Sequence, residues 1–527
     1  MDNVHSRGME KEARRLALGC PARREDYHYL LMGAITVVIS YSPGSSFTET
    51  LSGFVVSDLI GSVEVVCDRP VDLSVPRCNT VVAGPIISGE TLNKILSGIR
   101  TEYFLLVPGY QQVSHGAGAI EKLFKTAASA GAGIVYSDYY DEGGKGRTLH
   151  PLNDYQLGSV RDDFDFGEMM LFSAAAVRDA VKQYGAIPDV RYAGLYDLRL
   201  KVSMDNPIRR VAEPLYSVVA ADGHSEGEKH FAYVDPRNEA VQKEMESVFT
   251  DYLKKTGAYL PPGDLKQVGP ANRAFPVEAS VIIPVLNRKG TVADAVKSAL
   301  SQETDFPFNV IVVDNHSTDG TTDVLAGLAR QDSRLKHIIP ERRDLGIGGC
   351  WNEALYSGAC GRYAVQLDSD DLYSGQEVIQ RIVDTLREGR YAMAVGSYTI
   401  VNERLEEILP GLIDHREWTD ANGHNNALRI NGLGAPRAFD AGVMRDIGFM
   451  NVSYGEDYAA ALRICREYCI GRIYESLYLC RRWPGNTDAA LSIEAANRND
   501  AFKDGIRTDE IIARRKMNSE RSFNATG

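Results

Sequence analysis

The stretch GRYAVQLDSDDLYS (361–374) contains an apolar run of strand length that ends in three carboxylates within four residues. Such a run predicts a buried strand. The stretch TEYFLLVPGYQQVS (101–114) contains a similar run in the first half of the chain. At its end, Pro108, Gly109 and Tyr110 stand where Asp368, Ser369 and Asp370 stand in the other copy. The shared strand therefore belongs to the fold, and the aspartates of one copy are candidates for chemistry.

Three further pairs of segments follow in the same order, about 250 residues apart, which indicates a duplicated domain. They are AITVVIS (34–40) with ASVIIPV (279–285), VEVVCDRP (63–70) with VIVVDNHS (310–317), and 194–218 with 454–480. Helix-period stretches such as 290–302 and 320–331 separate the strand-like runs. This alternation predicts an α/β fold with a mostly parallel sheet in each half.

Length and composition fit more than one globular domain, since 527 residues exceed what one hydrophobic core supports. A net charge of −13 argues against a nucleic-acid-binding protein, which needs a basic face. The eight cysteines form no CxxC pair, which is typical of a reducing compartment. The N-terminus is polar, and the apolar run near 30–39 is too short to span a bilayer. We therefore expect a cytoplasmic protein without a transmembrane segment.

These patterns divide the chain into five predicted parts. A polar N-terminal extension (1–29) precedes the first domain (30–228). A charged helical segment and a Pro/Gly-rich linker (229–276) follow, and then the second domain (277–490) and a helical tail (491–527).

Polar residues follow three predicted strands of the second domain, where ligands of open α/β sheets bind. Pro284 is expected to stop the first strand, Asp314 ends the second, and the LDSDD sequence ends the third. Asp368 and Asp370 would face the same side of an extended loop. Two carboxylates suit Mg²⁺ or Mn²⁺ together with substrate phosphates and water. The alternative is a solvated turn in which Asp371 caps the next helix.

Two more motifs lie between and after these strands. In GEDYAAALRI (455–464), Glu456 and Asp457 begin an amphipathic helix. They either match the helix dipole or supply a general base. In DLGIGGCWNEAL (344–355), three glycines either form a tight turn or let the backbone approach a ligand.

Taken together and in this order, the motifs resemble the inverting family 2 glycosyltransferases of the GT-A fold, over residues ~278–487 by motif spacing. The resemblance implies two GT-A-like domains in tandem. It implies that Asp314 contacts the nucleotide base, that Asp368 and Asp370 hold ribose and a metal-bound diphosphate, and that Asp457 is the general base with Glu456 beside it. The implied donor pocket also includes Pro284, Leu286, Asn287, Arg288 and Gly346. Trp483, Arg482, Gly434 and Ala435 are the candidate acceptor contacts, and the implied cofactor is Mn²⁺ or Mg²⁺.

The sequence departs from the family pattern at two places. Trp483 occupies the position where many members carry a histidine, which leaves the metal to aspartates, phosphate and water. Trp351 replaces an arginine that often precedes the asparagine of the glycine-rich loop. Arg482 and Trp483 resemble the Arg-Trp pair of processive synthases, but the glutamine that precedes this pair in those enzymes is replaced by Leu479. This replacement, together with the missing membrane helices, argues against a processive synthase.

The first domain lacks the acids of the second. Cys67 stands at the place of Asp314 and Tyr196 at that of Glu456, although Asp197 persists opposite Asp457. The first domain is therefore interpreted as a degenerate, inactive copy that serves as a scaffold, in dimerisation or in acceptor binding.

The expected function is metal-dependent transfer of a sugar, with inversion, from a nucleoside-diphosphate donor to a glycan or other hydroxyl acceptor. UDP-sugars are favoured as donors, with GDP-mannose as the other candidate. The segment 414–439 is the expected site of acceptor choice. Two alternatives stay open, a sugar-nucleotide nucleotidyltransferase and a non-catalytic carbohydrate-binding scaffold. The oligomeric state is open too, a homo-oligomer included.

Overall fold

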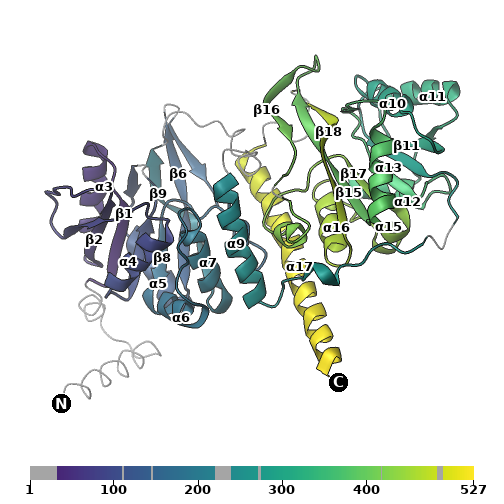
Figure 1. Ribbon diagram of the computed structural model, residues 1–527. Coiled ribbons are helices and arrows are strands. Elements are labelled where there is room, and N and C mark those ends of the chain that lie inside the picture. Colours follow the sequence, from purple (N-terminus) through teal and green to yellow (C-terminus); the bar gives the residue numbers. More distant parts are fainter. Residues whose placement is uncertain are drawn as a thin grey trace. The chain divides into compact units, whose positions relative to one another are not determined.

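A computed structural model describes residues 33–109, 112–143, 146–219, 239–270, 274–416, 418–483 and 491–526. The predicted N-terminal extension and parts of the predicted linker lie outside these residues. The chain divides into two compact units (Figure 1). Unit 1 comprises Met1–Leu152 and Phe166–Asp222, and unit 2 comprises Asn153–Asp165 and Gly223–Gly527. The segment 153–165 is therefore part of unit 2, although the sequence prediction placed it inside the first domain.

Unit 1 is an α/β unit built on one mixed sheet. Its described strands pair in the order β3-β2-β1-β4-β8-β6-β9-β5, and β7 pairs with β6. The strands are β1 (Ile35–Ser40), β2 (Ile60–Cys67), β3 (Cys78–Val82), β4 (Tyr103–Val107), β5 (Val113–His115), β6 (Ile134–Gly143), β7 (Gly146–His150), β8 (Met170–Ser173) and β9 (Ile208–Val219). The helices are α3 (Ser45–Val55), α4 (Gly89–Gly98), α5 (Ala119–Ala130), α6 (Ala174–Tyr184) and α7 (Gly194–Asp205).

Unit 2 repeats this architecture. Its described strands pair in the order β12-β11-β10-β13-β17-β15-β18-β14, and β16 pairs with β15. The strands are β10 (Ala279–Val285), β11 (Phe308–Asp314), β12 (Leu335–Ile338), β13 (Tyr363–Gln366), β14 (Leu372–Tyr373), β15 (Met393–Val401), β16 (Glu407–Ile413), β17 (Arg437–Asp440) and β18 (Ile470–Arg481). The helices are α9 (Glu239–Lys255), η3 (Pro262–Asp264), α10 (Val292–Leu300), α11 (Thr321–Gln331), α12 (Ile347–Tyr356), α13 (Val378–Gly389), α14 (Gly423–Asn426), α15 (Ala441–Ile447), α16 (Glu456–Cys465) and α17 (Ile493–Thr526).

The two strand orders are the same, which confirms the predicted tandem α/β fold. Even an irregularity is shared, because the β6–β9 and β15–β18 pairs both shift register near the middle, at Ser137/Tyr139 and at Ser397/Tyr398. The sheets are mixed rather than mostly parallel. Strands β12, β11, β10 and β13 run parallel, and β17 turns the sheet by pairing antiparallel with both β13 and β15.

Strand β10 lies at the centre of the parallel part and is almost wholly buried. Continuous apolar runs of this kind are typical of strands covered on both faces. The expectation that Pro284 stops the strand was wrong, because β10 continues to Val285. Pro284 still pairs with β11, but β13 pairs with β10 only as far as Ile282. The missing N–H of proline therefore costs no ladder hydrogen bond on the β13 side.

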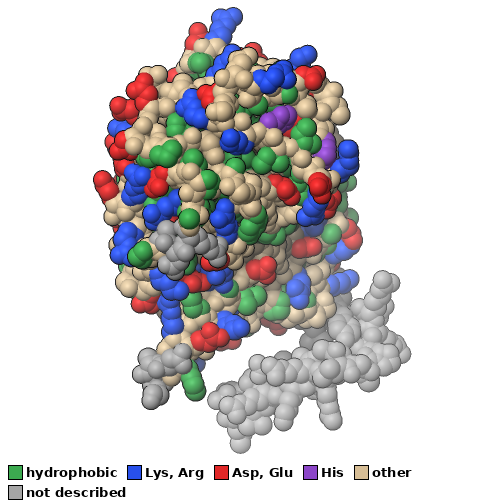
Figure 2. Space-filling model, turned by 90° about the vertical axis from the view of Figure 1, so that its right-hand side faces the viewer, with side chains coloured by type: hydrophobic (Ala, Val, Ile, Leu, Met, Phe, Trp, Pro, Cys, Tyr) green, Lys and Arg blue, Asp and Glu red, His purple; other side chains and the backbone are tan. Residues whose placement is uncertain are grey.

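The surface and the helices add two observations. Acidic and basic side chains are interspersed on the face shown in Figure 2. Within the described ranges, no helix is long and apolar enough to cross a membrane.

Candidate functional site

The predicted site lies where β10, β11 and β13 end. These three strands are parallel neighbours, so their carboxyl ends meet at one edge of the sheet. Arg437 connects the acid pair of α16 to this edge. Its Nη1 lies 2.8 Å from the Asp457 carboxylate, and its backbone N–H donates at 3.1 Å to Gln366 Oε1, the side chain that also holds Asp368. Residues from the strand ends and from α16, far apart in sequence, thus contribute to one acidic site.

The aspartates after β13 have different surroundings. The backbone N–H of Asp368 donates to the Tyr478 hydroxyl at 3.0 Å, and Gln366 Nε2 donates to the Asp368 carboxylate at 3.0 and 3.2 Å. Asp370 lies 3.6 Å from Arg288 Nε, and the Trp483 indole N–H donates to it at 3.4 Å. The backbone of Asp368 is thus bonded to a tyrosine of β18, whereas the carboxylate of Asp370 contacts both the Arg288 guanidinium and the Trp483 indole.

Asp371 has a structural role instead of the helix cap considered from the sequence. Its Oδ1 accepts a hydrogen bond from the backbone N–H of Arg481 at 2.8 Å, and α13 begins only at Val378. Burial and the neighbouring charges of Asp368 and Asp370 raise the pKa of Asp371 well above its usual range. Asp371 therefore ties the aspartate loop to the end of β18.

The acid pair opens α16, as the sequence predicted. Gly455 precedes the helix with a φ of 78°, in the left-handed region that favours glycine. The Asp457 carboxylate is 31% exposed and lies 2.8 Å from Arg437 Nη1. Burial alone would raise the pKa of Asp457, but the charges of Arg437 and Lys503, together with backbone N–H hydrogen bonds, more than offset it, so this pKa lies below its ordinary value. Asp457 is therefore ionised and accessible at neutral pH.

Glu456, its neighbour, has the opposite electrostatics. The residue is 8% exposed, and its Oε2 accepts no hydrogen bond from any described group. Burial, reinforced by the charge of Asp457, raises the pKa of Glu456 to about 7. Two adjacent carboxylates thus have pKa values pushed apart, an arrangement typical of acid–base sites.

The raised pKa of Glu456 predicts a pH-dependent stability. The pKa of Glu456 in the folded protein, about 7, exceeds the ordinary 4.5, so the folded state favours the neutral side chain. Its contribution to the free energy of unfolding is therefore fully present below pH 4.5 and is lost as the pH rises through 7. Between pH 4.5 and 8, we expect the free energy of unfolding of the wild type to fall by about 3 kcal/mol relative to Glu456→Gln. All three tryptophans (Trp351, Trp418 and Trp483) lie in unit 2, so urea unfolding followed by tryptophan fluorescence measures this unit. Parallel pH profiles for the two proteins would contradict the expectation.

The glycine-rich loop holds the backbone that leads into the acid pair. A Cβ on Gly346 would lie 2.5 Å from the Val452 carbonyl carbon, and a Cβ on Gly348 would lie 1.9 Å from the Met450 carbonyl oxygen. The Gly346 N–H donates to Asn451 Oδ1 at 2.8 Å. These glycines therefore admit the segment 450–453 against α12. Direct donor contact by Gly346 stays a prediction.

Gly348→Ala is expected to destabilise unit 2 by about 3 kcal/mol, because the new methyl group would overlap both the Met450 carbonyl and the Glu456 side chain. The matched control is Gly358→Ala, whose added Cβ would meet no atom within 4 Å. Its free energy of unfolding should stay near that of the wild type. Urea titration with tryptophan fluorescence compares the two, and equal midpoints would show that the loop can yield.

The predicted donor residues surround the ends of β10 and β11. Asn287 has a φ of 55°, and its side-chain oxygen accepts from the Thr318 N–H at 2.7 Å. Leu286 is half exposed and Arg288 partly buried. Asp314 is fully buried, and its two oxygens accept from Ser317 N at 3.0 Å and Thr322 Oγ1 at 2.5 Å. Contact of Asp314 with a nucleotide base stays a prediction.

The candidate acceptor residues flank the same acids. Gly434 is left-handed with a φ of 96°, and its carbonyl accepts from Arg437 Nη1 at 2.9 Å. Ala435 follows it directly. Arg482 bonds through its backbone N–H to Val401, and the Trp483 ring lies 5.9 Å from the Arg288 guanidinium. Trp351, by contrast, packs in the core against Phe439 and Phe449.

Arg437 and Lys503 were not predicted from the sequence, although both lower the pKa of Asp457. Arg437 follows a proline in a segment without a motif, and Lys503 belongs to the polar tail. Burial and the charge of Arg507 lower the pKa of Lys503 to about 8, although Asp457 acts in the opposite direction. Only the fold brings these cations to the acid pair.

The equivalent helix of unit 1 carries a neutralised acid. The Asp197 carboxylate pairs with Lys201 Nζ at 2.6 Å, one helical turn away, and both side chains are buried. In α16 the residue one turn after Asp457 is Ala461. The carboxylate of Asp197 is thus neutralised by an ion pair within its own helix.

The carboxylate oxygens of the aspartate loop suit a divalent cation that is bound together with a substrate. Among the described residues, no group of three or more His, Cys, Asp or Glu side chains is arranged to hold a metal ion. Mg²⁺ is commonly held by only one or two carboxylates, with substrate phosphates and water completing its shell. Asp368 and Asp370 provide that number, and burial together with the repulsion of Asp370 raises the pKa of Asp368. A cation would relieve this repulsion.

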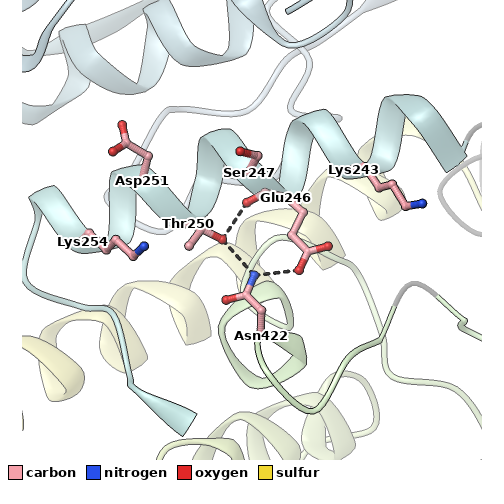
Figure 3. A pocket seen from close by; sticks show the side chains of 7 residues that line it. All are labelled: Lys243, Glu246, Ser247, Thr250, Asp251, Lys254 and Asn422. Carbon is pink, nitrogen blue, oxygen red and sulfur yellow. Dashed lines mark hydrogen bonds between the residues drawn. The ribbon is translucent and has the colours of Figure 1, made fainter. Parts of the chain in front are cut away.

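A separate cavity of about 330 Å³ lies along α9 and is lined by that helix and by Asn422 (Figure 3). Asn422 Nδ2 donates to Glu246 Oε1 at 2.7 Å and to Thr250 Oγ1 at 2.8 Å. Of the predicted site, its lining includes only Asn422, which belongs to the predicted acceptor segment 414–439. The two hydrogen bonds of Asn422 hold the chain that follows β16 against α9.

Comparison with known proteins supports the resemblance drawn from the sequence. Residues 280–442 match the family model "Glycosyl transferase family 2". An uncharacterized glycosyltransferase of Rickettsia conorii is 27% identical over 201 residues, which cover 38% of this chain and 32% of that protein. A Campylobacter jejuni protein named GalNAc(5)-diNAcBac-PP-undecaprenol beta-1,3-glucosyltransferase is 34% identical over 126 residues, which cover 24% and 39%.

Among solved structures, Staphylococcus aureus TarS 1–349 in complex with UDP-GlcNAc aligns with a TM-score of 0.34 at 21% identity. The alignment covers 45% of this chain and 72% of that one. The chain spans about a third of the length of the first two curated relatives it matches. The region that matches the family model, 280–442, includes the aspartate loop and Arg437 and ends before α16.

Proposed function

We propose that unit 2 transfers a sugar from a nucleoside-diphosphate donor to a hydroxyl group of an acceptor, with inversion at the anomeric carbon. The observation that carries the proposal is the accessible, ionised Asp457 in the same acidic cluster as the Asp368–Asp370 loop of a family 2 glycosyltransferase domain. UDP-sugars are the favoured donors and GDP-mannose is the other candidate. A glycan is the favoured acceptor.

In this mechanism, Asp457 accepts the proton of the acceptor hydroxyl as that oxygen attacks the anomeric carbon. Arg437, 2.8 Å from its carboxylate, keeps Asp457 ionised and fixes its direction. Inversion follows from a single displacement, in which the attacking oxygen and the departing diphosphate lie on opposite sides of the anomeric carbon.

Asp368 and Asp370 would hold Mn²⁺ or Mg²⁺, which supplies positive charge for the leaving diphosphate. Arg288, 3.6 Å from Asp370, would meet the same phosphates and keep that carboxylate oriented. Pro284, Leu286, Asn287 and Arg288 would line the nucleotide pocket, with Asp314 and Gly346 at its edges.

We propose further that unit 1 has no transfer activity of its own. The Asp197–Lys201 ion pair supports this, because a carboxylate already paired with a buried ammonium is a poor proton acceptor. The replacement of Asp368 and Asp370 by Pro108 and Tyr110 supports it as well.

Nucleotide-sugar turnover tests the proposal. The purified chain is incubated with UDP-glucose, UDP-N-acetylglucosamine or GDP-mannose and with Mn²⁺ or Mg²⁺, and the products are analysed. Release of UDP or GDP with sugar transferred or hydrolysed supports it. Pyrophosphate from a nucleoside triphosphate and a sugar phosphate would identify a nucleotidyltransferase instead. Carbohydrate binding without turnover of any nucleotide would leave a non-catalytic scaffold.

A further inference from the structure

The segment 153–165 belongs to the first half of the sequence but packs inside unit 2. Its backbone lies directly on α17. The Gly158 N–H donates to Thr508 Oγ1 at 2.8 Å, and a Cβ on Gly158 would lie 2.0 Å from the Asp504 carbonyl oxygen. The Ser159 hydroxyl donates to Asp504 Oδ2 at 2.9 Å. Such close contact requires the two elements to fold together.

A buried ion-pair cluster fixes this contact. The Arg161 side chain is 5% exposed and lies 3.1 Å from Asp500 Oδ2 and 3.4 Å from Asp504 Oδ1, both on α17. Removing one member of a buried charge cluster leaves the others uncompensated, so its geometry is strongly constrained. The segment 153–165 therefore has one defined position on α17.

The same segment reaches the chain that precedes β17. Asp162 Oδ1 lies 3.0 Å from Nη1 of Arg429, whose side chain is fully buried and also donates to Gln242 Oε1 of α9 at 2.8 Å. Asp163 Oδ2 accepts from Asn431 Nδ2 at 3.1 Å. We call residues 422–436 the 422–436 segment. It is thus held both by the segment 153–165 and by α9. Asn422 provides a second anchor on α9 (Figure 3).

Helix α17 connects these contacts to the acid pair. Arg507 is fully buried and pairs with Asp504 at 2.8 Å. Its Nε donates to the Leu428 carbonyl at 2.9 Å and to the hydroxyl of Tyr458, the residue after Asp457, at 3.0 Å. Lys503 Nζ donates to the Asn431 carbonyl at 2.7 Å. One polar network therefore joins 153–165, the 422–436 segment and α16.

We infer that the segment 153–165 is a positioning element for the acceptor side of the unit 2 site. The inference rests on the proposed function. It assigns the first half of the chain a part in the reaction without a second active site. The 422–436 segment contains Gly434 and Ala435 and leads directly to Arg437, so a shift of this segment moves the acceptor side and the partner of Asp457 together. The donor contacts at β10 and β11 lie outside this network, whereas β13 meets it where the Arg437 N–H donates to Gln366 Oε1 at 3.1 Å.

Asp162→Asn in the full chain tests the inference. It removes the charge that faces Arg429 and leaves the donor-side strand ends unchanged. With the active nucleotide sugar from the panel above and methyl glycosides as acceptors, we expect the KM for the acceptor to rise roughly tenfold, because small misplacements of reacting groups are costly. The KM for the donor should stay within about twofold, and the ratio of transfer to donor hydrolysis should fall by about the same factor as the acceptor KM rises.

Hydrogen exchange of the same variant gives a readout that needs no acceptor. Peptides covering 422–436 and α16 should lose protection, whereas peptides covering β10 and β11 should not. Asp162→Glu, which keeps the charge, should recover most of the acceptor KM. If Asp162→Asn does not fold, Asp163→Ala, which removes the acceptor of the Asn431 hydrogen bond, replaces it in both measurements.

The matched control is Gln156→Ala in the same segment, whose side chain bonds only to the Ala501 carbonyl of α17 among the contacts described. It should leave both KM values within about twofold, since it does not touch the 422–436 segment. Unchanged acceptor KM and unchanged exchange in a folded Asp162→Asn protein would overturn the inference. An equal rise in both KM values would also overturn it, because that pattern indicates general loosening. Failure of the wild type to turn over any nucleotide sugar would refute the proposed function instead, and the exchange experiment would still test the contact.

Discussion

Asp457→Asn is expected to lower kcat for sugar transfer roughly 10²–10⁴-fold, the usual contribution of a general base. The amide keeps the size of the carboxylate and can still accept a hydrogen bond from Arg437, but it cannot take the proton of the acceptor. The donor KM should change little, because the donor-side strand ends do not depend on this carboxylate. Steady-state kinetics at saturating donor, with UDP or GDP release as the signal, measure the loss.

The position of Asp197 in unit 1 provides the matched control. Asp197→Asn breaks the buried pair with Lys201 and should reduce the stability of unit 1, but kcat per folded molecule should remain that of the wild type. A loss of less than tenfold in Asp457→Asn would remove Asp457 from the role of base. Glu456, with its pKa of about 7, would then be the next residue to test.

Asp370→Asn is expected to reduce transfer by at least about 10²-fold and to weaken Mn²⁺ binding, because one of the two carboxylates for the cation is lost. Trp483 gives a direct signal, since its indole N–H bonds to Asp370 at 3.4 Å. In the wild type with UDP present, Mn²⁺ should quench the fluorescence of Trp483. In Asp370→Asn the quenching should require a much higher Mn²⁺ concentration.

Trp483→Phe identifies the signal, because it leaves only Trp351 and Trp418, which are buried and lie outside the predicted metal site. The exposed Asp305 provides the carboxylate control, and Asp305→Asn should quench like the wild type. Equal Mn²⁺ dependence in Asp370→Asn and wild type would show that the cation, if bound, is held elsewhere.

The fold could be predicted well because duplication supplies an internal comparison. A strand seen twice with different residues after it separates the requirements of the sheet from those of the chemistry, as VPGY (107–110) and LDSD (367–370) illustrate. The order of acids along the chain, from Asp314 through Asp370 to Asp457, also allowed a site to be predicted, since parallel strand ends share one edge. The strand directions beyond β13 were missed, because antiparallel β17 is short and has no distinctive pattern.

The electrostatic partners of the acids could not be predicted. Arg437 and Lys503 lie far from Asp457 in sequence, and nothing in their local spacing marks an interaction that only tertiary contact creates. The glycines of 346–349 were ambiguous for a similar reason. Their requirement comes from the carbonyls of Met450 and Val452, about 100 residues later in the chain.

The position of the segment 153–165 has a consequence for the order in which the chain folds. Its hydrogen bonds to α17 join residues 344 to 350 positions apart. Closure over such a separation is slow compared with local contacts. During synthesis, the partner helix α17 is made only after the described strands of unit 2. Until then, we expect the apolar Val160 and the charged Arg161 to remain exposed. Unit 2 reaches its final state only when that helix arrives, so we expect a late folding step in which α17 and the first-half segment dock together.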